Sequence, residues 1–68
     1  MPAASPPIQA LRGLRHAQGA LNNAIDGLEG SVRAKSQKQI DLRATHRAEV
    51  EKQIGELQAA LRNLAATL

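Results

Sequence analysis

The chain lacks residue types on which many small proteins depend. It has no cysteine and no phenylalanine, tyrosine or tryptophan among its 68 residues. The absence of cysteine excludes disulfide bonds and thiolate metal sites, and the absence of aromatic rings excludes stacking surfaces for bases or sugars. Domains of this length are marginally stable alone and usually gain stability from disulfides, metals or oligomerisation. We therefore expect this chain to oligomerise.

Long hydrophobic runs are also missing. No segment approaches the roughly 18 consecutive apolar residues that a membrane span requires. No Lys or Arg precedes Arg12, and residues 1–7 contain no hydrophobic run, so the start of the chain differs from a secretory signal. The sequence predicts a cytoplasmic protein that does not contact a membrane.

What the chain does contain is fifteen large aliphatic residues: nine Leu, four Ile and two Val. A first row advances in steps of three and four, the spacing of one face of a helix. Its members are Leu11, Leu14, Gln18, Leu21, Ile25, Leu28 and Val32. Four alanines flank and narrow this row: Ala10, Ala17, Ala20 and Ala24. Gln18 interrupts it, and a polar residue at such a position can fix register or oligomer state.

A second row with the same spacing occupies the other half of the chain. Its members are Ile40, Arg43, Arg47, Val50, Ile54, Leu57, Leu61, Leu64 and Leu68. The step from Val32 to Ile40 is eight residues rather than seven, which rotates the stripe by about 100°. The two rows therefore belong either to two helices joined by a turn or to one helix of about 90 Å with an irregular middle.

Local signals favour the turn. Ser5 and the prolines after it are typical of a helix start. Gly30-Ser31 predicts a helix C-cap, and Ser36 with Gln39 fits a capping box. We expect a flexible Pro-rich leader at 1–6 and a single helical oligomerisation module at 7–68. The predicted fold is all-α: a helical hairpin, about 7–29 and 37–66, that assembles as a coiled coil or bundle. The alternative is one long continuous helix in a coiled-coil oligomer.

The aliphatic rows predict a non-enzymatic protein–protein interaction module, namely a scaffold, an adaptor or an oligomerisation element. The expected partners are the chain itself, as a dimer or tetramer, and another protein. Two hairpins pairing in this way make a four-helix bundle. The expected interface residues are Leu11, Leu14, Leu21, Ile25, Leu28, Val50, Ile54, Leu57, Leu61 and Leu64.

Candidates for chemistry are few. His16 lies off the first row beside Arg12 and Arg15, with no metal-ligating residue at a suitable spacing. His46 and Glu49 stand three apart on a helix, the reverse order of the Glu-x-x-His motif of di-metal bundles. No Gly-x-Ser-x-Gly elbow or phosphate-binding glycine loop is present. We predict no catalytic, cofactor-binding or metal-binding residues.

A basic segment supports a second hypothesis from a different class. Five cationic residues lie within fifteen positions: Arg33, Lys35, Lys38, Arg43 and Arg47. Only Asp41 opposes them, and the whole chain carries a net charge of +3. Doubled in a dimer, this patch would offer positive charge to nucleic-acid phosphates or to an acidic partner. The alternative function is therefore a small nucleic-acid-binding regulator that dimerises through the same helices.

Residues 46–68, HRAEVEKQIGELQAALRNLAATL, resemble the long dimerisation helix of MerR-type transcription regulators. In that family the helix pairs in an antiparallel coiled coil. It covers about a third of the chain. Nothing before residue 46 matches the family's winged helix-turn-helix, so the resemblance assigns no DNA-contacting residue.

Overall fold

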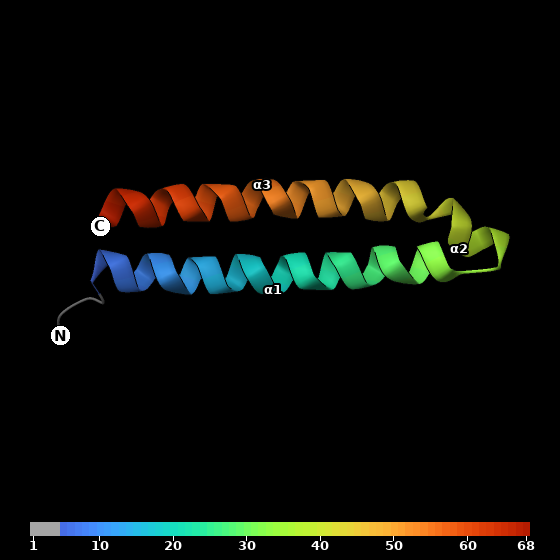
Figure 1. The fold of residues 1–68 in the computed structure, drawn as a ribbon, viewed down its shortest axis with the longest axis horizontal. Coiled ribbons are helices and arrows are strands. Elements are labelled where there is room, and N and C mark those ends of the chain that lie inside the picture. The colour runs from blue at the N-terminus through green and yellow to red at the C-terminus, as the bar shows by residue number, and fades with distance from the viewer. Residues whose placement is uncertain (1–4) are drawn as a thin grey trace.

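The computed structural model describes residues 5–68 and shows a helical hairpin (Figure 1). The elements are α1 at Pro6–Arg33, α2 at Gln37–Asp41 and α3 at Arg43–Thr67. Helices α1 and α3 lie side by side and antiparallel, with the short α2 at the tip and with the start of α1 and the end of α3 together at the opposite end. The extents are 53 × 21 × 13 Å, which confirms the hairpin and contradicts the single 90-Å helix.

The start of α1 follows the predicted capping. The hydroxyl of Ser5 accepts a hydrogen bond from the backbone N–H of Ile8 at 3.4 Å, and prolines occupy the first helical positions. Proline is suited to this place because its missing N–H would have no helical partner there. Residues 1–4 of the expected leader lie outside the described residues.

The predicted end of the first helix at Gly30-Ser31 is wrong. Helix α1 continues to Arg33, and its C-cap is Ala34 in an extended conformation. Gly30 lies within the helix, and no glycine of the described chain has the positive φ of a glycine C-cap. Ser31 is fully buried, and its hydroxyl donates to the carbonyl of Leu28 at 2.9 Å. Ser31 therefore packs as a helical residue instead of ending the helix.

The turn after α1 is stabilised by residues that follow it in the chain, namely α2 and Arg43. Ser36 accepts a hydrogen bond from the N–H of Gln39, as the predicted capping box requires. The guanidinium of Arg43 donates from Nε to the carbonyl of Ser31 at 2.8 Å and from Nη2 to that of Val32 at 2.9 Å. These carbonyls belong to the last turn of α1 and have no helical N–H partner. Arg43 thus caps α1 from the beginning of α3.

The contact line between the helices is built from small residues. Of the described residues, the buried ones are Ala10, Ala17, Ala24 and Ser31, each seven positions after the last. A seven-residue repeat keeps them on one face of α1, as in a coiled coil. Small side chains let two helix backbones approach closely, towards the lower end of the usual 8–10 Å separation. No large aliphatic residue of residues 5–68 is buried.

Candidate interaction face

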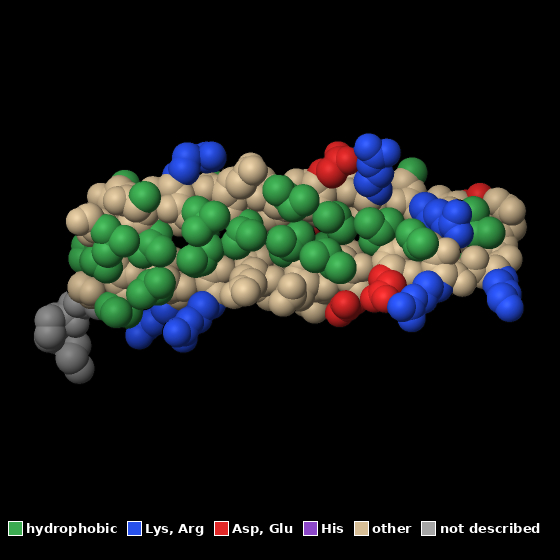
Figure 2. Space-filling model, viewed as in Figure 1, with side chains coloured by type: hydrophobic (Ala, Val, Ile, Leu, Met, Phe, Trp, Pro, Cys, Tyr) green, Lys and Arg blue, Asp and Glu red, His purple; other side chains and the backbone are tan. Residues whose placement is uncertain are grey.

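One broad face of the hairpin is apolar along most of its length. Figure 2 shows a band of hydrophobic side chains that runs along the middle of the molecule across both long helices. We call the band the apolar face. Its residues on α1 are Leu11, Leu14, Leu21, Ile25, Leu28 and Val32. Its residues on α3 are Val50, Ile54, Leu57, Leu61 and Leu64, and Leu68 follows the end of α3.

Six of the ten predicted interface residues lie where the two helices of one chain meet. They are half-buried and flank the line of small residues: Leu14, Leu21, Leu28, Val50, Leu57 and Leu64. The other four are exposed on the apolar face: Leu11, Ile25, Ile54 and Leu61, with exposed fractions of 39, 45, 41 and 48 %. The predicted interface therefore divides into an inner row that folds the hairpin and an outer row that the hairpin leaves in solvent.

Helix geometry explains this division. Successive residues turn by 100°, so Leu14 lies about 60° from Ala17 around the helix axis, and Gln18 lies about 40° further from Ala17 on the same side. Residues aligned with Ala17 meet α3, residues aligned with Leu14 border that contact, and those aligned with Gln18 point away from it. Ile25 and Val32 share the alignment of Gln18, and both are exposed. The same steps on α3 make Leu57 inner and Ile54 and Leu61 outer.

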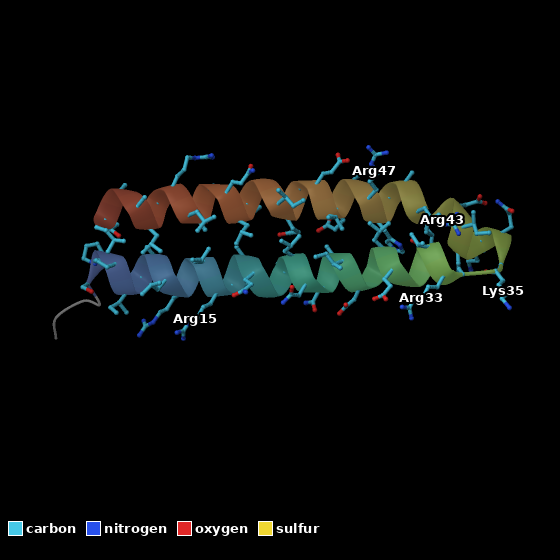
Figure 3. The ribbon with its side chains drawn as sticks, in the orientation of Figure 1. Arg15, Arg33, Lys35, Arg43 and Arg47 are labelled. Carbon is cyan, nitrogen blue, oxygen red and sulfur yellow. The ribbon has the colours of Figure 1, made fainter. Side chains whose placement is uncertain are left out.

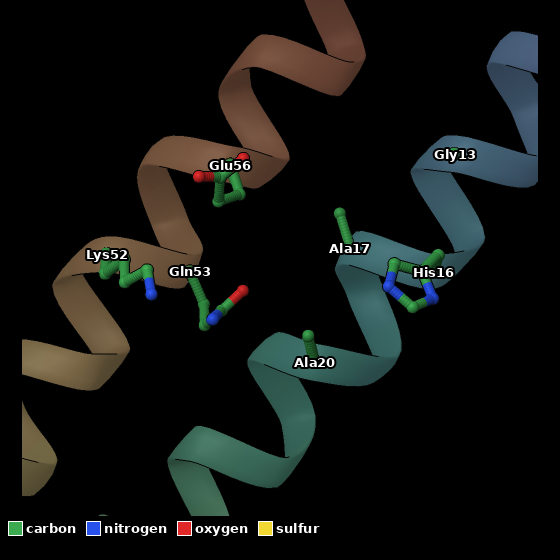
Figure 4. Close-up of a pocket in the computed structure, with 7 residues that line it drawn as sticks. All are labelled: Gly13, His16, Ala17, Ala20, Lys52, Gln53 and Glu56. Carbon is green, nitrogen blue, oxygen red and sulfur yellow. The ribbon is translucent and has the colours of Figure 1, made fainter.

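The opposite face of the hairpin carries small and polar residues instead of large aliphatic ones. Two adjoining grooves of about 360 and 420 Å³ run along it between α1 and α3. Figure 4 shows the first, with Gly13, His16 and Ala20 on one wall and Lys52, Gln53 and Glu56 on the other. The grooves exist because α1 carries glycine or alanine at 13, 20 and 27, again seven apart. Their charged and polar rims are solvated side chains.

Both histidines lie on this polar face. His16 lines the first groove and His46 the second. The ring of His46 packs over Gly27, with Cδ2 3.7 Å from the place that a Cβ on Gly27 would occupy. Its Nδ1 is buried without a hydrogen-bond partner. Within residues 5–68, no three His, Asp or Glu side chains gather in a metal-ligating group.

The five basic residues of the tip do not form one patch. Figure 3 shows Arg33 and Arg47 on opposite edges of the hairpin and Arg43 between the helices. Arg33 pairs with Glu29 at 2.7 Å and Arg47 with Glu51 at 3.0 Å, while Arg43 is held by α1 carbonyls. Among the residues that the structure describes, Lys35 and Lys38 make no ion pair. Both acidic partners stand four residues from their arginines, a spacing that the sequence contains and that would have revealed these pairs.

Comparison with protein-family models, curated proteins and solved structures finds no match to this chain. Within the described residues, neither long helix has a stretch apolar enough to cross a membrane. The function is therefore argued from the hairpin itself.

Proposed function

We propose that this chain is a non-enzymatic assembly module whose apolar face docks against helices of another protein chain. The observation that carries the proposal is the position of the large aliphatic residues. Eight of them are exposed in the hairpin, among them Val32 at 56 % and Leu61 at 48 %. Among residues 5–68, the hydrophobic residues that are buried are three alanines.

Solvent exposure of such a face is costly. Burial of apolar surface contributes roughly 25 cal/mol per Å², so each outer aliphatic side chain adds about 1 kcal/mol or more when a partner covers it. Contiguous apolar patches on small proteins mark interaction sites, whereas isolated exposed aliphatics do not. The rows on α1 and α3 have the helical spacing that receives the ridges of a second pair of helices. A helical partner in a bundle fits this surface best, and the cytoplasm is the location that we expect for it.

Site-specific photo-crosslinking in the cells that make the protein tests the proposal without assuming the partner. A photoreactive residue at Ile54 lies on the apolar face, and one at Ala48 lies on the exposed outer surface of the same helix. We expect crosslinked adducts from position 54 and few from position 48. Equal yields from the two positions, or no adduct from position 54, would contradict the docking face.

Nucleic-acid binding through the basic residues is the second proposal, and its support is narrower. At the tip, Lys35, Lys38 and Arg43 pair with no carboxylate in the described chain, and Arg43 is held by the carbonyls of α1. Lys35 and Lys38 are therefore the two tip charges that are most open to phosphates. Few phosphate contacts predict weak binding with a shallow salt dependence. A gel-shift assay at low salt, with the Lys35→Glu/Lys38→Glu variant as control, tests it: retardation of wild type alone is the expected result.

A further inference from the structure

We propose that the partner on the apolar face is a second copy of this chain, placed antiparallel, so that α1 packs on the partner's α1 and α3 on its α3. This inference rests on the proposed function and specifies its occupant. It is carried by the spacing of charged and apolar residues along the edge of the apolar face and by the size of that face.

The outer edge of α1 carries one row in which charge reverses from end to end. Arg15, Asn22 and Glu29 are seven residues apart, are all exposed, and border the outer aliphatic residues of α1. Arg15 lies on this edge in Figure 3. A two-fold axis at Asn22 sets Arg15 of each copy opposite Glu29 of the other, about 10 Å on either side of the axis. Opposite charges then meet at both ends of the row, where Glu29 lies between Arg15 of the other copy and Arg33 of its own chain, with which it pairs at 2.7 Å.

The aliphatic residues fit the same axis. With Asn22 against Asn22, Leu21 faces Leu21, Leu14 faces Leu28 and Leu11 faces Val32, all within about two residues, or about 3 Å, of the same level. A slide of one heptad either way removes the facing of Arg15 and Glu29. The apolar spacing repeats every heptad, and the charged row selects one of the registers that this spacing allows.

The other helix accepts this arrangement. Ala20 on α1 and Gln53 on α3 line both grooves, which fixes how the two helices are aligned. From that alignment the axis passes near residue 51 of α3 and brings Val50 against Ile54. Glu51 of the two copies then lie near one another, and each is already neutralised by Arg47 at 3.0 Å.

The area is sufficient. The broad face measures 53 × 21 Å between Cα extremes. A stable interface buries roughly 800 Å² on each partner, which antiparallel overlap of two such faces provides.

In a parallel pairing about an axis along the helices, α1 would lie on the partner's α3 and the row of Arg15, Asn22 and Glu29 would not meet itself.

Cysteine crosslinking tests the register directly, because the natural chain has no cysteine. In the Asn22→Cys variant the two thiols lie across the axis, so we expect rapid disulfide-linked dimers under mild oxidation. The Ala48→Cys variant, on the outer surface of α3, should link at least tenfold more slowly. Equal rates, or a wild-type chain with the 7.2-kDa mass of one copy in light scattering at 100 μM or less, would overturn the proposal.

Charge exchange tests the ion pairs. We expect Arg15→Glu to raise the dimer dissociation constant about tenfold, because two pairs become repulsive, and Arg15→Glu/Glu29→Arg to restore it to within about threefold. Lys52→Glu reverses one charge in the same way on the polar face and should leave the dimer dissociation constant unchanged. Failure of the double variant to recover would contradict this register. Photo-adducts of Ile54 with a different protein, beside a monomeric purified chain, would end this inference and leave the proposed function standing.

Discussion

The two broad faces of the hairpin are made by the same two helices and have opposite character. One carries Leu, Ile and Val on both helices, whereas the other carries glycine, alanine, histidine and charged groups around two open grooves. Between them lies the contact line of Ala10, Ala17, Ala24 and Ser31. The difference shows that the chain does not place its large apolar residues where they would stabilise one copy most. It leaves several of them exposed on one side of the hairpin, among them Ile25 and Ile54.

The largest expected effect separates the inner row from the outer row. Leu57→Asp puts a carboxylate at a half-buried position between the helices, and we expect a loss of about 3 kcal/mol, with dissociation and melting together. Ile54→Asp makes a comparable change at a position that is 41 % exposed. It should weaken association and make the melting temperature independent of protein concentration. Circular dichroism and light scattering measure both, and identical behaviour of the two variants would erase the distinction between rows.

A substitution in the contact line tests how closely the helices pack. Ala17 is 7 % exposed, so in the Ala17→Leu variant the larger side chain must push α3 away. Overpacking of this kind costs about 1–3 kcal/mol. Ala48→Leu makes the same chemical change at an exposed site of α3 and should shift stability little. Urea denaturation compares the two; a more stable Ala17→Leu chain would show that the helices have room to spare there.

The tip offers a smaller and more local test. Arg43→Ala removes the donors to the carbonyls of Ser31 and Val32, and we expect a loss of about 1–2 kcal/mol. Arg33→Ala removes an exposed pair with Glu29, which should cost less than about 1 kcal/mol. Hydrogen exchange of the last turn of α1 should rise in the first variant alone. Equal protection in both would argue against the cap.

The smallest expected effect has the opposite sign. A Cβ at Gly55 meets nothing within 4 Å, so Gly55→Ala should stabilise α3 by about 1 kcal/mol. For a domain of this size that raises the melting temperature by about 4–8 °C. Gly27→Ala should gain less, because its methyl group would meet the ring of His46. Thermal unfolding orders the two; a lower melting temperature for Gly55→Ala would indicate a contact that the single hairpin does not make.

The hairpin was predictable because its signals are local. The eight-residue step between the rows, the Ser5 cap and the Ser36 cap each depend on residues a few positions apart, and both caps are confirmed. The end of α1 was not predictable in this way. Gly30 suggested a stop, but what continues the helix is burial of Ser31 against α3 and a cap from Arg43, twelve residues away.

The division of the aliphatic residues was hidden for a related reason. Leu14, Leu21 and Leu28 border both the contact line and the apolar face, so a pattern of large residues combines two surfaces into one row. Three of the four residues that define the contact line are alanines, and in the sequence these alanines appeared only to flank that row. The face proposed for docking emerges once the inner residues have been assigned to the fold.

The slender contact line has a consequence for the outside of the molecule. Each long helix carries its own row of aliphatic side chains. The distance between α1 and α3 decides whether these two rows form one continuous surface or two separate ones. Alanine at every seventh position of α1 lets the two helices pack closely. The half-buried side chains on either side of the contact line then form one surface: Leu14, Leu21 and Leu28 from α1 and Val50, Leu57 and Leu64 from α3. The smallest side chains of the interior thereby determine the shape that the hairpin presents to any partner.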